Sequence, residues 1–186
     1  MTQERTVSPS TASLLAAARS EGKRGAPPVH LWDPPYCGEI DIIIRRDGTW
    51  FHEGTPIGRP GLVQLFASIL KREGDRHFLV TPVEKVGIQV EDAPFVAVDF
   101  EQSGDTILFE TNVGDRVAAG PDNPLRVEFA ADGEPSPYVE VRRGLEALID
   151  RKSFYRLVEI GREENGMFGL RSGGSFFPII AAAELG

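Results

Sequence analysis

Short alternations of apolar and polar residues fill the centre of the chain and limit what it can fold into. From His77 to Arg116, turn residues separate four runs that are rich in β-branched and aromatic side chains: "HFLV", "KVGIQV", "FVAVDF" and "TILFET". This pattern predicts successive β-strands. The runs "PLRVEF" and "YVEVR" continue it. The sequence therefore predicts a β-meander as the centre of the fold.

The flanking segments predict a mixture of hairpins and helices. Ile40 to His52 is typical of a hairpin, with Asp47-Gly48 as its turn. Pro60 to Lys71 carries one apolar helical stripe, and so does "RRGLEALIDRK". The last part of the chain predicts three more strands, in "SFYRLVEIG", "GMFGLRS" and "SFFPII".

These elements predict an α+β fold of two similar antiparallel β-rich subdomains, each with one packed helix. Residues 1–30 are expected to form an N-terminal helix, from Ser10 to Ser20 with Ser10 as its N-cap, and a linker. Residues 31–102 form the first predicted subdomain, and residues 103–186 form the second.

The order of predicted elements near the front recurs near the back. A strand, a helix that opens with Gly-Leu and a strand that contains Leu-Val occur in both places, at Gly61-Leu62 and Leu79-Val80, then at Gly144-Leu145 and Leu157-Val158. This indicates either an internal duplication or the ordinary recurrence of elements in an α+β protein. A duplication would give two related halves, and crevices between domains are common ligand sites.

Charge and cysteine content exclude several classes of partner. The 186 residues carry a net charge of −8, which repels long phosphate backbones and argues against binding of a nucleic-acid polymer. The single cysteine, Cys37, has no internal partner, as expected in a reducing cytoplasm. The only apolar run near the start, Leu14 to Ala17, is too short for a secretion signal or a membrane span. We expect a cytoplasmic protein with no membrane association.

No catalytic or metal-binding motif stands out. The three histidines, His30, His52 and His77, lie far apart in the sequence, so we expect no metal site. The chain has no GxSxG, GxGxxG or GxxxxGK[ST] motif, and we expect no cofactor and no enzymatic activity. "SGGS" (Ser172 to Ser175) is interpreted as a hairpin turn rather than an anion-binding nest.

Two acidic pairs occur in the stretch from Thr81 to Phe100. Glu91 and Asp92 are adjacent and would point to opposite faces of a strand, so they are interpreted as a solvated turn before Pro94. Glu84 shares its strand face with aliphatic residues, so it lies either at the end of the sheet or beside a cation, for which Arg59, Arg142 and Arg143 are candidates. It is therefore either a structural ion pair or a ligand contact.

Basic and aromatic residues are interleaved in the second half of the chain. The set consists of Arg126, Arg142, Arg143, Arg151, Lys152, Arg156 and Arg171 with Tyr138, Phe154 and Tyr155. Guanidinium and aromatic groups together suit the phosphate and the base of a nucleotide. The alternative is a solvated face of helix and strand.

Several of these stretches together resemble a bacterial family, domain-of-unknown-function family 1285. They are "CGEIDIIIRRDGTWFHEGTPIGRPGLVQLFASIL", "FLVTPVEKVGIQVEDAPFVAVDF", "TNVGD", "PYVEVRRGLEALIDRKSFYRLVEIG" and "RSGGSFFPI", between Cys37 and Pro178. The resemblance implies a duplicated core whose C-terminal half is pleckstrin-homology-like. It also implies a nucleotide-like ligand at the domain interface and a role in signal transduction. The chain departs from the expected pattern at Gly87, where a larger polar or basic side chain is expected in the strand.

The leading functional hypothesis is a non-enzymatic regulatory protein that binds an anionic, nucleotide-like small molecule between its halves. Its expected ligand or interface residues are Arg59, Thr81, Glu84, Lys85, Arg142 and Arg143. A second hypothesis is a pleckstrin-homology-like module that binds a protein partner. A third is a hydrolase that uses Glu84 or Asp92 as its base.

Overall fold

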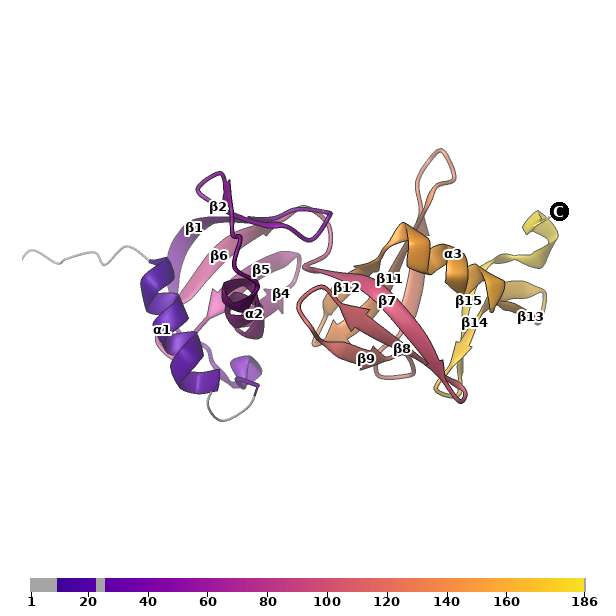
Figure 1. The fold of residues 1–186 in the computed structure, drawn as a ribbon, viewed down its shortest axis with the longest axis horizontal. Coiled ribbons are helices and arrows are strands. Elements are labelled where there is room, and N and C mark those ends of the chain that lie inside the picture. Colours follow the sequence, from indigo (N-terminus) through magenta and orange to yellow (C-terminus); the bar gives the residue numbers. More distant parts are fainter. Residues whose placement is uncertain (1–9, 23–25, 186) are drawn as a thin grey trace, which may run out of the picture. The chain divides into compact units, whose positions relative to one another are not determined.

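The chain divides into two compact units between Glu91 and Asp92 in a computed structural model that describes residues 10–22 and 26–185 (Figure 1). The sequence placed the boundary later, at 102/103. The predicted boundary cuts strand β7 (Phe95–Ser103) before its last residue, and both hydrogen-bonded neighbours of β7 belong to the second unit. The backbone pairing of β7 therefore assigns it to that unit.

The first unit is built on a six-stranded sheet. Its strands are β1 (Tyr36–Ile44), β2 (Trp50–His52), β3 (Thr55–Pro56), β4 (Leu70–Glu73), β5 (Arg76–Val80) and β6 (Lys85–Val90). They lie in the order β3-β2-β1-β6-β5-β4. Every neighbouring pair is antiparallel except β1 and β6, which are parallel. The sheet thus consists of two three-stranded meanders joined through one parallel pair.

The second unit repeats this arrangement. Its large sheet contains β7, β8 (Thr106–Thr111), β9 (Arg116–Ala118), β10 (Leu125–Phe129), β11 (Pro135–Arg142) and β12 (Leu145–Ile149). The order is β10-β11-β12-β7-β8-β9, and the parallel pair is β12 with β7. The two sheets have the same topology, which confirms the predicted α+β fold with a duplicated β-rich core.

The two segments that repeat each other in the structure differ from the two that the sequence predicted. The structural copies are β1–β6 and β7–β12, whereas the sequence aligned a helix at Pro60 with a helix at Gly144. Residues 145–149 are strand β12, in which Leu145, Ala147 and Ile149 are buried and the residues between them are not. This period of two was read as a helical stripe because three aliphatic residues in five positions fit both patterns.

The segment after β12, predicted as a strand, is helix α3 (Arg151–Glu159). Asp150 caps it, since its carboxylate accepts a hydrogen bond from Ser153 N at 2.9 Å. Phe154 and Leu157, three positions apart, face the core. The cap and this spacing explain a helix where the β-branched and aromatic content favoured a strand.

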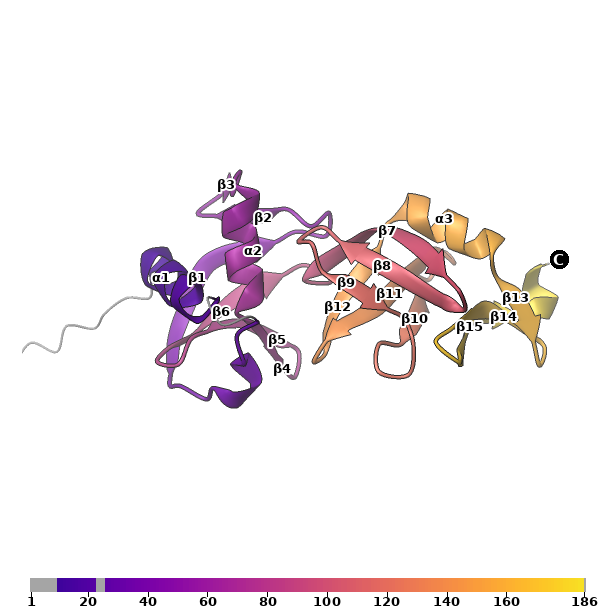
Figure 2. The same cartoon turned by 60° about the horizontal axis from the view of Figure 1, so that its bottom comes forward.

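Helix α2 (Pro60–Ser68) packs against the apolar face of the first sheet (Figure 2). The ring of Phe66 stacks on that of Trp50 from β2, with 6.2 Å between centroids and 14° between planes. Pro60 begins the helix as predicted. The helix ends earlier than expected, because Lys71 belongs to β4 and pairs there with Phe78.

Helix α1 (Thr11–Gly22) belongs to the first unit and contacts α2. Ser10 accepts a hydrogen bond from Ser13 N through its hydroxyl, the N-cap that the sequence predicted. Leu14 and Ala18 are fully buried. A 3₁₀ turn, η1 (Val29–Leu31), follows. The predicted linker lies partly outside the described residues, at 23–25.

A three-stranded sheet completes the second unit. It contains β13 (Arg162–Glu164), β14 (Met167–Ser172) and β15 (Ser175–Ala181), followed by a second 3₁₀ turn, η2 (Ala182–Leu185). Gly173-Gly174 connects β14 to β15, so "SGGS" is the predicted hairpin turn. Among the described residues, no helix is long and apolar enough to cross a membrane.

The pH dependence of stability should report the burial of His77, which lies in β5 opposite Ile88 on the apolar side of the first sheet. Burial, with a smaller contribution from the charge of Arg72, lowers the pKa of His77 from 6.5 to about 4. Between pH 6.5 and about 4, His77 binds a proton in the unfolded chain but stays neutral in the folded chain. The free energy of unfolding should therefore fall as pH decreases from 6.5 toward 4.

Urea denaturation at a series of pH values measures this slope. The pKa of Glu73 lies below its usual value of 4.5, so the upper part of the window reports His77 without a contribution from that carboxyl. His77→Leu should flatten the slope there, and the exposed His30→Gln should keep it. Equal slopes in the wild type and His77→Leu would contradict the assignment.

Candidate ligand-binding site

One face of the first sheet carries charged and aromatic side chains instead of an apolar layer. Residues directly opposite each other on neighbouring strands share a face. Gly87 of β6 lies opposite Glu39 of β1 on one side and Phe78 of β5 on the other. Tyr36 lies opposite Lys85, and a register shift on β1 separates Tyr36 from Glu39. The parallel pair therefore brings residues 36–39 beside residues 85–87.

Five side chains on this face form what we call the basic–aromatic cluster: Tyr36, Glu39, Arg76, Phe78 and Lys85. The Arg76 guanidinium lies 5.5 Å from the ring centroid of Tyr36 and 4.9 Å from that of Phe78. The Lys85 ammonium lies 4.9 Å from the Phe78 centroid, and the two rings meet edge to face at 6.2 Å. Phe78 is buried, whereas Tyr36 is 49% exposed.

Acidic side chains pair with the cations of this face. Glu39 accepts hydrogen bonds from Arg76 and from the Tyr36 hydroxyl, the latter at 2.5 Å. Glu73 of β4 accepts from Lys85 at 3.0 Å and forms an ion pair with Lys71 at 3.3 Å. The hydrogen bond from Lys85 holds the pKa of Glu73 below its usual value, against the opposing effect of burial. The Glu73 carboxylate is thus ionised at neutral pH.

The Glu39 carboxylate lies directly on the backbone of β6 at Gly87. A Cβ at position 87 would overlap both oxygens of that carboxylate. The backbone of Gly87 is outside the left-handed region, so space rather than conformation gives this glycine its role. The carboxylate of Glu39 fills the space that the larger side chain expected at position 87 would take.

Thr81 and Glu84, both predicted site residues, form the turn between β5 and β6. The buried Thr81 hydroxyl accepts hydrogen bonds from the backbone N–H groups of Val83 and Glu84 at 3.3 and 3.1 Å. The Glu84 carboxylate accepts from the Ser13 hydroxyl of α1 at 3.0 Å. The partner of Glu84 in the structure is thus this hydroxyl, where the sequence suggested an arginine. The turn places Lys85 at the start of β6.

The three predicted arginines lie elsewhere. Arg59 is the exposed N-cap residue of α2. Arg142 ends β11, donates to Asp115 at 2.8 Å and lies 5.1 Å from the Phe95 centroid. Arg143 is exposed and occupies the β11–β12 turn. Of the six predicted residues, Thr81, Glu84 and Lys85 are brought together in one turn of the first unit.

Ion pairs occupy the basic set of the second half. Arg126 donates to both carboxylate oxygens of Glu146, at 2.7 and 2.8 Å, and its guanidinium lies over Tyr138. Further pairs join Arg151 to Glu134, Lys152 to Asp150, Arg156 to Asp99 and Arg171 to Glu164. Tyr138 and Phe154 are buried. These contacts favour the structural interpretation of this set.

The candidate bases of a hydrolase both accept structural hydrogen bonds. Asp92 accepts from the Tyr138 hydroxyl through both oxygens, at 2.8 and 2.9 Å, and Glu84 accepts from Ser13. Glu91 is exposed in the turn before β7, as predicted for this acidic pair. Within residues 10–22 and 26–185, no group of three or more His, Cys, Asp or Glu side chains is placed to hold a metal ion.

Comparison with known proteins identifies the family. Residues 27–93 match the N-terminal domain, and residues 94–179 the C-terminal domain, of DUF1285, a family described as of unknown function. The chain belongs to the DUF1285 family. The two matches meet close to the boundary between the structural units.

Two solved structures of DUF1285 proteins are similar to this chain. One, from Silicibacter pomeroyi DSS-3, is 61% identical with a TM-score of 0.86, and the comparison covers 92% of this chain and 97% of that chain. The other, from Shewanella baltica OS155, is 33% identical with a TM-score of 0.52, over 63% of this chain and 90% of that chain. No curated protein matches the chain.

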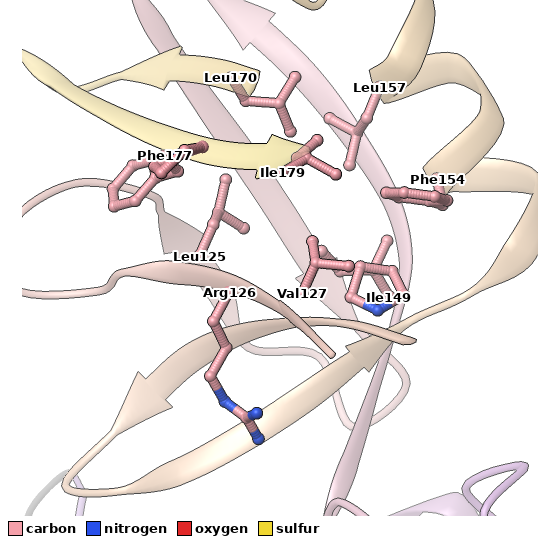
Figure 3. A pocket seen from close by; sticks show the side chains of 11 residues that line it. Leu125, Arg126, Val127, Ile149, Phe154, Leu157, Leu170, Phe177 and Ile179 are labelled. Atoms are coloured by element: carbon pink, nitrogen blue, oxygen red, sulfur yellow. The ribbon is translucent and has the colours of Figure 1, made fainter. Parts of the chain in front are cut away.

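An apolar seam in the second unit of this DUF1285 chain has little room for a ligand (Figure 3). Leu125 and Val127 of β10 face Leu170, Phe177 and Ile179 of the small sheet. The cavity between them is about 10 Å³, at the lower limit for one water molecule. The seam is where the small sheet packs on the large one.

A second hollow in this unit is larger, about 50 Å³, but it is acidic. Asp99, Glu101 and Glu110 line it with Arg116, whose guanidinium donates to Glu101 at 2.6 Å. An excess of carboxylates disfavours a negatively charged ligand. The basic–aromatic cluster is therefore the better candidate for an anion.

Sequence reasoning missed four members of that cluster, Tyr36, Glu39, Arg76 and Phe78. They come from β1 and β5, which are separated by about forty residues of sequence, and these strands meet because both pair with β6, β1 in parallel and β5 antiparallel. The signal that did point to this place was Gly87, which departs from the expected pattern of its strand.

Replacing Arg143 with Asn should stabilise this DUF1285 protein, because Arg143 has a φ of 45° in a two-residue turn with Gly144. The β13–β14 turn has the same form and carries Asn165-Gly166, the pair that such turns prefer. Relief of the left-handed strain should add about 0.5–1 kcal/mol to the free energy of unfolding. Denaturant unfolding measures the change. A loss of stability would show that contacts of the Arg143 side chain stabilise the protein by more than the backbone strain at this position destabilises it.

Proposed function

We propose that this protein is a non-enzymatic regulatory protein that binds an anionic, nucleotide-like small molecule and serves in signal transduction. The observation that supports the proposal is the basic–aromatic cluster on the first sheet. The hypothesis first arose from the family resemblance, and the contacts of this cluster now give it named donors and a stacking surface within one unit.

The charges of the cluster and its neighbours favour an anion. Three cations, Lys71, Arg76 and Lys85, meet two carboxylates, Glu39 and Glu73, on this face. The positive charges exceed the negative ones by one, in a chain whose net charge is −8. Arginine and lysine near aromatic rings are the groups with which proteins commonly hold phosphates.

The aromatic rings favour a ligand with a planar group. Tyr36 is half exposed, so part of its surface is available for stacking, and Phe78 supports it edge to face. Base stacking on an exposed aromatic ring is worth about 1–3 kcal/mol. A phosphate on the Arg76 and Lys85 side chains with a base on Tyr36 would use all three groups.

The second unit has its own arginine–tyrosine contact on different strands, between β10 and β11, and that contact is closed. Tyr138, under the Arg126 guanidinium, is 3% exposed, and Arg126 is held by both oxygens of Glu146. The hydrogen bonds that Arg126 donates to Glu146 and Glu128 raise the pKa of Arg126 above its usual value. The first unit is therefore the better site for a ligand. The alternative of a pleckstrin-homology-like protein-interaction module stays a prediction, because none of these contacts distinguishes it.

Thermal unfolding in the presence of nucleotides tests the proposal. Adenosine monophosphate and other nucleoside phosphates at millimolar concentration should raise the melting temperature, because a ligand that binds only the native state stabilises it by about 2.7 kcal/mol at a hundredfold excess over Kd. Arg76→Ala should abolish the shift, since it removes the central cation of the cluster.

Arg45→Ala is the matched control. Arg45 belongs to the same unit, lies 4.8 Å from the Phe51 centroid and pairs with Glu91, so its loss removes an equivalent charge and ring contact outside the cluster. This variant should keep the full shift. No shift across a broad nucleotide panel, or an undiminished shift in Arg76→Ala, would reject the site.

A further inference from the structure

The carboxylate of Glu39 occupies the position in the cluster that an anion would take. It accepts hydrogen bonds from Arg76 and from the Tyr36 hydroxyl, and it lies against the backbone of β6 at Gly87. Arg76 is thus the charged donor, the Tyr36 hydroxyl is the neutral donor, and the backbone at Gly87 is the surface on which the carboxylate lies. The chain's own side chain thus fills the most favourable anion position of the first unit.

We propose that Glu39 is an internal competitor, which the anionic group of the ligand, a phosphate or a carboxylate, displaces when it binds. The inference rests on the proposed function and deepens it, since it assigns the anion to one position and makes binding conditional on the movement of Glu39. Such a contact is autoinhibitory, because an unliganded site holds its own carboxylate.

Gly87 provides the space in which the Glu39 carboxylate lies. A Cβ at position 87 would overlap both oxygens of that carboxylate, so any anion held in this place needs a residue without a Cβ beneath it. The space above Gly87 is used by the Glu39 carboxylate alone among the nearest atoms. A ligand anion with the same two donors would need that same space.

Displacement of Glu39 requires only a side-chain movement. Its side chain is 51% exposed, so the carboxylate can turn into water and be solvated there. Arg76 is 56% exposed and stays over its two rings, which hold its guanidinium in place for the incoming group. The exchange replaces one charge-assisted hydrogen-bond acceptor with another at the same donors.

Competition of this kind lowers the apparent affinity by the fraction of molecules in which the site is open. If Glu39 occupies the position in nine molecules of ten, removing its carboxylate should tighten binding about tenfold. A Cβ in the space above Gly87 should instead weaken binding. This change and the removal of the Glu39 carboxylate both clear that carboxylate from its present position, but they should change the affinity in opposite directions.

Isothermal titration with adenosine monophosphate tests the competition in the full chain. Glu39→Ala should bind about tenfold more tightly than the wild type. Gly87→Ala should bind more weakly, since its Cβ blocks the ligand and displaces only the flexible end of Glu39 without backbone strain. Asp41→Asn, an equal change of charge at an exposed position of the same strand, should change affinity less than about twofold. Adenosine, which lacks the phosphate, should gain nothing from Glu39→Ala.

Each other outcome rejects a definite part of the account. Equal or weaker binding of adenosine monophosphate to Glu39→Ala, with the wild type binding it, would overturn the competition and leave the proposed function standing. Unchanged affinity in Gly87→Ala would also overturn it, because the anion would then not lie on β6. No binding to any variant, Glu39→Ala included, would reject the proposed function itself.

Discussion

The parallel pairing of β1 with β6 joins two antiparallel meanders into one sheet, and the same pairing of β7 with β12 does so in the second unit. Meanders form from local contacts, whereas a parallel pair needs a connection that crosses from one edge strand to the other. In the first unit that connection contains α2, and in the second it is the loop between β9 and β10. The duplicated core depends on this one pairing, because without it each unit would be two separate three-stranded sheets.

The pairing also places the chemistry of the first unit. It sets Tyr36 and Glu39 beside Lys85 and Gly87, and the neighbouring antiparallel strand adds Arg76 and Phe78. The second unit has an arginine over a tyrosine on its large sheet, but the guanidinium there is locked by Glu146 and the ring is buried. The first sheet thus has a partly exposed cluster over a glycine, whereas the arginine on the second sheet is held in an ion pair. The same topology supports a candidate site in one unit and a structural contact in the other.

The sequence predicted the fold class and the strands from His77 to Arg116, because alternation and turn residues are local signals. The pattern of elements left the duplication open, and the family resemblance implied it. The sequence predicted a helix before Asp150 and a strand after it, and the structure has them the other way round. Short apolar runs there fit both periods, and the hydrogen bond that caps the helix at Asp150 determines where the helix begins. At the site it reached Lys85 and singled out Gly87, yet it linked Glu84 to arginines when the partner is Ser13. The residues that it missed lie on β1 and β5, on either side of β6, and one sequence read along its length carries no signal for the parallel pairing that places β1 there.

The central claim is that the anion position lies on β6 at Gly87, between the donors from β1 and β5. A nuclear magnetic resonance titration of ¹⁵N-labelled protein with adenosine monophosphate tests it most directly, because each backbone amide reports its own surroundings. The account predicts the largest shifts at Gly87 and at Tyr36 to Glu39, with smaller ones at Arg76 to Phe78. Saturable shifts confined to other residues, such as those around Arg126 and Tyr138, with Gly87 unmoved, would contradict it.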